Sequence, residues 1–201
     1  MKKLYIFFAT LLFVFFSTLT SYSQKNSIRI VKENYTCYFD TVLKQPLVVV
    51  YKLYKGGGDC SRAGFSFKND LSNVKTATQA DYARSGYDRG HLANAEDFAY
   101  DCKLDELTFR YYNCLPQSKI LNRGLWKQKE EESRKLSQLD TITVVCFGRE
   151  FFRDERLNVP KYCGKIVKEK NGKIHFWLFD QNGTLLPENK NILKEYSIYL
   201  N

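Results

Sequence analysis

The sequence predicts a single α+β domain with a mixed or antiparallel central sheet and helices, and three observations indicate it. Stretches rich in β-branched and aromatic residues recur along the chain, at 27–40, 46–55, 108–117, 141–150 and 164–180. One stretch, residues 122–139, has the apolar spacing of a helix. The strands and the helix do not alternate as βαβ units do, and no linker or internal repeat divides the chain, which favours α+β over α/β.

The strands follow from local patterns. Residues 27–40 and 46–55 are predicted as strands from their composition, and residues 141–150 are typical of a buried strand. Residues 108–117 are predicted as a strand that stops before Pro116, because proline cannot donate a ladder hydrogen bond. Residues 164–180 divide at Asn171-Gly172, which is typical of a tight turn, into the two strands of a hairpin.

The sequence also contains one predicted helix and one glycine-rich loop. Residues 122–139 contain no proline, and nearby leucines fall close to one helix face: Leu121, Leu125, Leu136 and Leu139. The glycine-rich stretch 56–64 lacks the spacing and the Lys-Ser/Thr pair of a P-loop, so we assign it no nucleotide-binding role.

The first residues have the pattern of a secretory signal peptide. Lys2 and Lys3 precede an apolar run over 4–16, and Ser21-Tyr22-Ser23 is a small-x-small cleavage pattern. The run is short for a membrane span, which needs about 20 residues. We therefore expect a signal peptide over 1–23, a domain over 24–201, and a secreted or periplasmic protein without stable membrane association after cleavage. The alternative is an uncleaved N-terminal anchor.

Charge and cysteine content narrow the class further. The chain has 201 residues and a formal net charge of +9, which favours a polyanionic partner such as nucleic acid, anionic lipid or acidic glycan, although many secreted proteins are simply basic. Its six cysteines, in an exported chain, predict disulfides, with Cys37 and Cys60 as the first expected pair because they flank the second strand. The absence of a CxxC pair disfavours a zinc ribbon or a thioredoxin-type site.

Two groups of residues are candidates for a chemical function rather than for packing in the core. In Asp88-Arg89-Gly90-His91, a permanent cation that fits phosphate oxygens stands beside a side chain that titrates near neutrality. Along the predicted helix, Asn122, Trp126, Glu130 and Arg134 recur every fourth residue, so they line one stripe. The bland interpretation of that stripe is a solvated face with an ordinary Glu130–Arg134 salt bridge.

Three motifs occur in order: Asp88-Arg89-Gly90-His91, then Asn113-x-x-Pro116-Gln117, then Asn122-Arg123-Gly124-x-Trp126-x-x-x-Glu130. In these motifs the sequence resembles the DNA/RNA non-specific endonuclease family. The resemblance implies a ββα-metal (His-Me finger) active-site core and a Mg²⁺-dependent, sugar-non-specific endonuclease that acts on DNA and RNA without sequence specificity. It also implies that Asn122 is the only direct protein ligand of the metal, for which Mn²⁺ or another divalent cation could substitute, and that Glu130 holds water around it.

The same resemblance suggests roles for the other motif residues. His91 is the expected general base. Arg89 and Arg134 are expected to neutralise charge on the phosphate. Asn113 is expected to orient the imidazole or to brace the metal ligand, and Asp88 to fix the backbone or an arginine.

Two features depart from the family pattern, and two other functions stay open. Asn94 replaces a usual proline, which would loosen the turn after His91, and Lys129 stands where the family prefers an apolar residue, which would expose that turn of the helix. The family's upstream arginine corresponds to Arg62 only loosely. His175, the only other histidine, lies in a predicted strand without metal-ligand spacing and is expected to be structural. A non-catalytic nucleic-acid binder and a phosphodiesterase for small nucleotides are the competing functions. The oligomeric state and the preference between DNA and RNA do not follow from the sequence.

Overall fold

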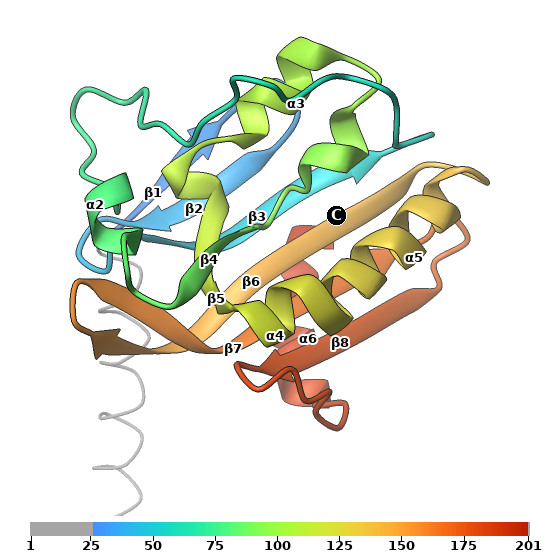
Figure 1. Ribbon diagram of the computed structural model, residues 1–201. Coiled ribbons are helices and arrows are strands. Elements are labelled where there is room, and N and C mark those ends of the chain that lie inside the picture. The colour runs from blue at the N-terminus through green and yellow to red at the C-terminus, as the bar shows by residue number, and fades with distance from the viewer. Residues whose placement is uncertain (1–25, 201) are drawn as a thin grey trace, which may run out of the picture.

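One antiparallel sheet runs through the middle of the protein in the computed structural model, which describes residues 26–200 (Figure 1). Its strands lie in the order β1-β2-β3-β6-β7-β8, so that β3 and β6 join the N-terminal and C-terminal halves of the chain. The bounds are β1 Ser27–Val31, β2 Thr36–Asp40, β3 Gln45–Leu53, β6 Ile142–Asp154, β7 Leu157–Lys168 and β8 Ile174–Asp180. This arrangement confirms the predicted α+β fold with an antiparallel sheet.

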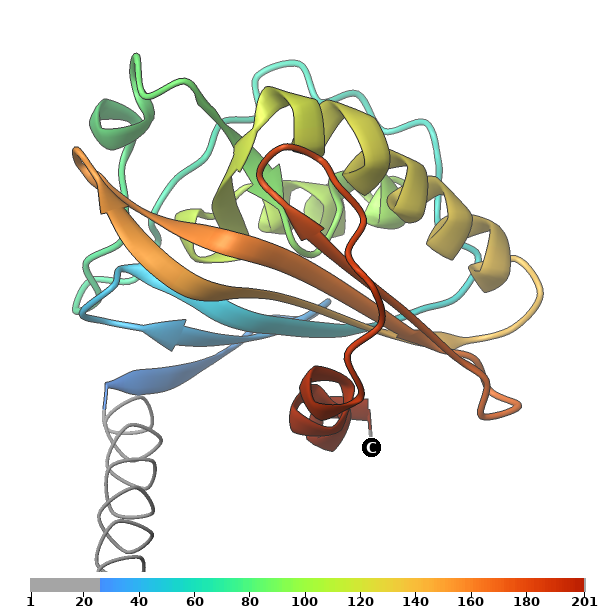
Figure 2. The ribbon, with the colours of Figure 1, turned by 90° about the horizontal axis from the view of Figure 1, so that it is seen from below.

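The segments between β3 and β6 cover one face of this sheet, and the C-terminal helix covers the other (Figure 2). The covering layer contains a two-stranded sheet of β4 (Tyr87–His91) and β5 (Cys114–Ser118). Its helical elements are α2 Gln79–Tyr82, η1 Ala95–Phe98, α3 Cys102–Thr108, η2 Tyr111–Asn113, α4 Lys119–Leu121, η3 Asn122–Trp126 and α5 Lys127–Ser137. The opposite face packs against α6 (Lys190–Tyr196), which η4 (Ser197–Leu200) follows.

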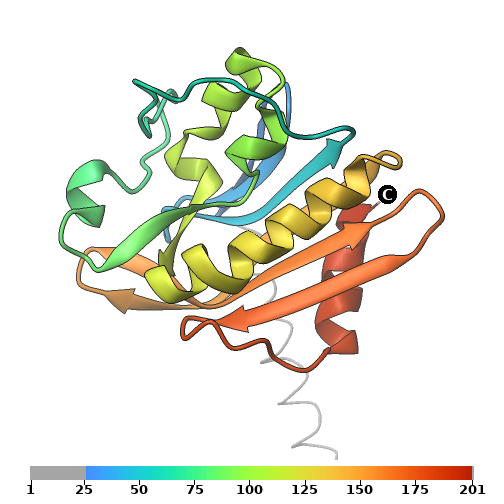
Figure 3. The ribbon, with the colours of Figure 1, turned by 45° about the vertical axis from the view of Figure 1, so that its right-hand side comes forward.

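The main core lies between the central sheet and the covering layer. Alternate residues of each strand point to opposite faces, so Cys163 and Val167 of β7 join the core under α5, whereas Ile166 packs toward α6. Helix α5 lies along β6, β7 and β8 (Figure 3). The fully buried Trp126, at the beginning of this helix, packs edge-on against Phe179 of β8. The helix is therefore anchored where its polar stripe begins.

Most of the predicted elements are present, but several bounds differ. Residues 27–40, predicted as a strand, form the two antiparallel strands β1 and β2. The turn at Asn171-Gly172 joins β7 to β8 as predicted. The predicted strand over 108–117 begins only at Cys114 and continues through Pro116, because β5 pairs with β4 alone and a proline at such an edge removes no ladder bond. Helix α5 ends at Ser137, so Leu139 lies beyond it and is exposed rather than on its apolar face.

The disulfide differs from the expected pair. Cys60 is bonded to Cys102, at the start of α3, and not to Cys37. Cys37 points into the core from β2, where its thiol contacts the carbonyl of Tyr112 at 3.0 Å, whereas Cys60 lies on a surface loop. Flanking a strand in sequence did not bring the two sulfurs together, because Cys37 is buried under η2 whereas Cys60 lies in a loop held against α3. The other four cysteines are free and buried: Cys37, Cys114, Cys146 and Cys163.

The predicted signal peptide, residues 1–23, lies outside the described residues. Among the helices of residues 26–200, none is long and apolar enough to cross a membrane.

Candidate active site

The Asp88-Arg89-Gly90-His91 motif forms most of β4, and its glycine sets how closely β5 approaches. A Cβ atom on Gly90 would lie 2.0 Å from Oε1 of Gln117 and 2.4 Å from its Cδ. Gln117 is fully buried and has little room to move aside. Only glycine therefore allows this approach, which fixes the separation of the two strands and the position of His91 at the end of β4.

His91 is packed between two phenylalanine rings. Its ring centroid lies 4.7 Å from that of Phe67 and 4.8 Å from that of Phe109. Nε2 is buried and has no hydrogen-bond partner among the described residues, whereas Nδ1 is not among the buried atoms that lack a partner. Burial, and after it the positive charges of Arg62 and Arg89, lowers the pKa of His91 to about 3. The imidazole is therefore neutral at physiological pH, as a general base must be before it acts.

Asn113 is buried behind His91 and holds the backbone that follows it. Its Oδ1 accepts a hydrogen bond from the amide of Ala93 at 2.9 Å, and its Nδ2 donates to the carbonyls of Ala93 at 2.9 Å and Thr108 at 2.8 Å. These bonds go to backbone atoms and not to the imidazole or to Asn122. Asn113 acts on the site through the chain two residues after His91.

Asn122 is presented by an irregular turn between two helices. The turn η3 has the wide hydrogen bonding of a π-helix, and Gly124 within it has a non-helical backbone with φ −102° and ψ −116°. Wide turns of this kind often occur at functional sites. Because Gly124 bends the chain, Asn122 lies at the mouth of the pocket while Trp126 packs in the core.

The amide of Asn122 is oriented by Asp88. Its Nδ2 donates to Oδ2 of Asp88 at 3.1 Å, which leaves its Oδ1 free to bind a cation. Arg123 pairs with both oxygens of Asp88, at 2.8 and 2.9 Å. The Arg123 hydrogen bond is the main cause of the lowered pKa of Asp88. As expected, Asp88 fixes an arginine, and it also fixes the amide that the resemblance assigns to the metal.

Glu130 lies in the first turn of α5, and its side chain is almost fully buried. Burial raises the pKa of its carboxyl to about 7, although the charges of Lys165 and Arg134 and a hydrogen bond from Asn94 lower it. A carboxyl group with this pKa changes its charge near neutral pH. Small changes in its surroundings will therefore decide whether Glu130 is ionised when the protein works.

Arg134 pairs with a carboxylate other than the one that the helical spacing suggested. Its Nη1 lies 2.5 Å from Oδ1 of the fully buried Asp97 in η1 and 3.3 Å from Oδ1 of Asn94, and no ion pair to Glu130 forms. Asn94 accepts a hydrogen bond from the amide of Glu96 at 2.8 Å and so caps η1. The expected loosening of the turn after His91 is therefore wrong, because Asn94 holds that turn as a cap.

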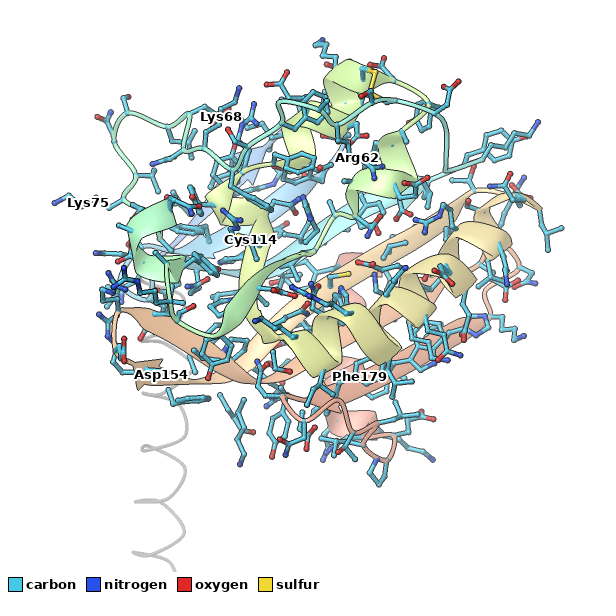
Figure 4. The ribbon with its side chains drawn as sticks, viewed as in Figure 1. Arg62, Lys68, Lys75, Cys114, Asp154 and Phe179 are labelled. Carbon is cyan, nitrogen blue, oxygen red and sulfur yellow. A yellow bond between two sulfur atoms is a disulfide. The ribbon has the colours of Figure 1, made fainter. Side chains whose placement is uncertain are left out.

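Two further arginines stand around His91. The guanidinium of Arg89 lies 5.2 Å from the ring centroid of Phe67 and hydrogen-bonds to Gln79. Arg62 pairs with Asp105 at 2.9 Å and with Glu96 at 2.7 Å. Figure 4 labels Arg62 on the loop that passes beside α3, the helix to which the Cys60–Cys102 disulfide ties this loop. The structure thus places Arg62 at the site, although its spacing in the sequence assigned it only loosely.

One pocket of about 820 Å³ brings these groups together. Its lining includes Arg62, Arg89, His91, Asn94, Asn122, Arg123, Glu130 and Arg134. Asn113 is the predicted site residue that does not line it, and His175 lies elsewhere, 2.6 Å from Glu169 on the β8 side of the sheet. The pocket therefore offers one neutral base, one free amide oxygen, one buried carboxyl group and several cations.

The donor set fits a hydrated divalent cation. Within residues 26–200, no group of three or more His, Cys, Asp and Glu side chains could hold a metal. Mg²⁺ does not need such a cage, since it keeps most of its water and binds through few hard oxygen atoms. Oδ1 of Asn122 is such an atom, and the carboxyl group of Glu130, which could accept hydrogen bonds from water, lines the same pocket.

The motifs did not reveal several residues that shape the pocket. Asp97, Asn94 and Phe67 come from segments that the sequence leaves irregular, and each acts through a contact distant in sequence. One residue of the sequence could have drawn attention to the buried charges beneath the pocket. Lys165 interrupts a stretch predicted to be a strand of the sheet, where a fully buried lysine requires an explanation.

Comparisons with known proteins agree with the geometry. The model of the DNA/RNA non-specific endonuclease family matches residues 16–198. The chain is 34% identical over 144 residues to "Endonuclease G, mitochondrial" of Homo sapiens, which covers 70% of the chain and 48% of the relative. It is 31% identical over 117 residues to "Nuclease EXOG, mitochondrial" of Homo sapiens, covering 56% of the chain and 32% of that relative. The chain spans about half the length of the endonuclease G relatives it matches, at 48%.

A solved structure supports the fold. The EndoG/EndoGI complex contains a chain that superposes with a TM-score of 0.69 at 21% identity, covering 83% of this chain and 82% of that one.

Proposed function

The chain belongs to the DNA/RNA non-specific endonuclease family, a metal-dependent family, and from that premise we propose that it hydrolyses phosphodiester bonds of DNA and RNA in the pocket around His91. One observation carries the proposal. A single pocket is lined by His91 of β4, Asn122 of the turn before α5, and Glu130 of α5, together with arginines. A nucleic-acid binder without activity would not need a neutral, half-buried histidine beside these groups.

The proposed roles follow from the surroundings of each side chain. Nδ1 of His91 accepts a proton from the attacking water. The low pKa of His91 reflects burial and two nearby cations, so a phosphate that offsets the charges of Arg62 and Arg89 makes the ring more basic when substrate binds. Arg89 and Arg134 face the phosphate and stabilise its developing charge.

Mg²⁺ is the proposed cofactor, with Mn²⁺ or another divalent cation able to replace it. Bound at Oδ1 of Asn122, the cation would neutralise charge on the phosphate and the leaving oxygen. Asp88 would keep that oxygen turned toward the pocket through its hydrogen bond to the Asn122 amide, and Glu130 would hold water around the cation. The substrate would be held through phosphates, which carry no sequence information, so the cleavage would be non-specific.

We also propose that the chain is exported, with residues 1–23 as a cleaved signal peptide and 24–201 as the nuclease domain. The Cys60–Cys102 disulfide supports this, since disulfides persist in oxidising compartments. The endonuclease G and EXOG relatives named above are mitochondrial proteins. Fractionation of the producing cells, with N-terminal sequencing of the recovered protein, would test both the location and the cleavage site.

The decisive experiment digests plasmid DNA and RNA with purified residues 24–201, with and without Mg²⁺, and repeats the metal titration on two variants. Asn122→Ala should lose most activity and should be rescued poorly by excess Mg²⁺. Arg134→Ala should bind all sequences more weakly while keeping its Mg²⁺ requirement. A shifted Mg²⁺ requirement in Arg134→Ala with an unchanged one in Asn122→Ala would refute these roles.

A further inference from the structure

Lys165 is a buried lysine without an oxygen acceptor among the described residues, and its polar neighbour is the thiol of Cys146, opposite it on β6. It lies in the middle of β7, is fully buried, and points into the core on the same face as Cys163 and Val167. Its Nζ lies 4.8 Å from the centroid of the Trp126 ring and has no hydrogen-bond partner among the described residues. Burying an ammonium group away from water is costly unless other charges compensate it.

The compensating charges come from carboxylates around α5: Glu130 follows Trp126, on which Lys165 lies, by one helical turn, and Asp97 is paired with Arg134 of the same helix. Burial lowers the pKa of Lys165, but Cys146, Glu130 and Asp97 together more than offset this, so the pKa is raised and the ammonium group stays charged. Burial raises the pKa of the Cys146 thiol to about 11, so at neutral pH the compensating negative charges are those of the two carboxylates. The three groups come from different elements: β6, α5 and η1. Neither carboxylate lies within ion-pair distance of Lys165, so the attraction acts through the low-dielectric interior.

A count of charges shows which carboxylate Lys165 compensates. Asp97 already has Arg134 at 2.5 Å and the hydroxyl of Tyr51 at 2.7 Å. Glu130 has no such ion pair within residues 26–200. If Glu130 were protonated, the cluster of Asp97, Arg134, Glu130 and Lys165 would bury one unbalanced positive charge.

We propose that Lys165 is the counter-ion of Glu130 and holds its carboxylate ionised and in place beneath the pocket. Lys165 is a positioning residue, because it reaches the site only through Glu130. The consequence for cleavage rests on the proposed function, whereas the charge coupling itself does not. Several groups from every element around Glu130 also influence its charge: Tyr51, Asn94, Asp97, Arg134, Cys146 and Lys165.

The coupling is measured on metal-free protein by urea unfolding of four forms: wild type, Lys165→Met, Glu130→Gln and the double variant. Methionine keeps the unbranched chain under Trp126, and glutamine keeps the shape of the carboxylate. At about pH 8.5, each single variant leaves one buried charge without its partner, so the double variant should be at least about tenfold more stable than the two single effects predict. At about pH 5 the coupling should disappear, because Glu130 is protonated, whereas a packing effect would persist.

Cleavage provides the second measurement. Lys165→Met should lose about tenfold in kcat/KM at neutral pH and recover at higher pH, because the acid limb of its profile moves upward. In the Glu130→Gln background the same substitution should cause no further loss. Lys161→Met, which removes an exposed lysine from the same strand, is the matched control and should change neither quantity.

Each outcome decides the proposal. A coupling below about twofold at pH 8.5, or one of equal size at both pH values, would overturn it. If Lys165→Met fails to fold, a folded double variant supports it, and an unfolded double variant beside a folded Glu130→Gln overturns it. A protein that shows the coupling but cleaves neither DNA nor RNA would refute the proposed function and leave the charge pair standing.

Discussion

Gly90→Ala tests whether the close approach of β4 and β5 builds the site. The added Cβ would lie 2.0, 2.4 and 2.8 Å from Oε1, Cδ and Cγ of Gln117, all closer than van der Waals contact allows. Gln117 is fully buried, so the strands must separate or the glutamine must leave its rotamer. Overpacking of this kind costs about 1–3 kcal/mol in the free energy of unfolding.

The same geometry predicts a rescue. The clashing atoms of Gln117 all lie beyond its Cβ, so Gln117→Ala removes every one of them. Gly90→Ala/Gln117→Ala should therefore be less destabilised than the sum of the two single variants by about 1 kcal/mol or more. Cleavage should fall in Gly90→Ala, because β4 carries His91 at its end, and should partly recover in the double variant.

Urea unfolding followed by far-UV circular dichroism gives the free energies, and plasmid nicking at fixed Mg²⁺ gives the activities. The reasoning would be refuted if Gly90→Ala matched wild type in stability. It would equally fail if the effects of the two substitutions were simply additive, since independence would mean that the glycine and Gln117 are not in contact.

Three more outcomes are expected. His91→Ala should lower cleavage at least about a hundredfold with an unchanged unfolding curve, and activity close to wild type would exclude it as the base. Cys60→Ser/Cys102→Ser should lose about 2–4 kcal/mol of stability, and wild type treated with reductant should match it in urea titrations. Since the pKa of Glu130 rises from 4.5 to about 7 on folding, stability should fall as pH rises between these values. Glu130→Gln should lack that decline, and an unchanged pH profile would contradict the assignment.

The sequence predicted the strands, the β7–β8 turn and most of the site, because these features depend on local periodicity and on short motifs. Their four-residue spacing predicted a common stripe for Asn122, Glu130 and Arg134, but in a regular helix such a stripe drifts around the axis, and the wide turn η3 corrects this drift. The partner of Arg134 could not be predicted, since Asp97 lies 37 residues away in a segment without helical or strand periodicity. The predicted disulfide pair was wrong for the same reason. Cys60 and Cys102 are separated by 42 residues, and only the packing of a loop against α3 brings them together.

The bent turn at Gly124 also explains why the motif spacing works at all. In an unbroken α-helix, Asn122 and Glu130 would point about 80° apart around the axis, and Asn122 and Arg134 about 120° apart. A turn that holds one residue more than an α-helical turn reduces each of these two angles by about 100°. All three side chains can therefore face one phosphate. The extra residue therefore determines the direction in which Asn122 points relative to Glu130 and Arg134. Making this turn a regular α-helix at unchanged chain length would rotate Asn122 by about 100° away from the pocket, whereas deleting one residue between Asn122 and Trp126 would keep the three side chains in phase.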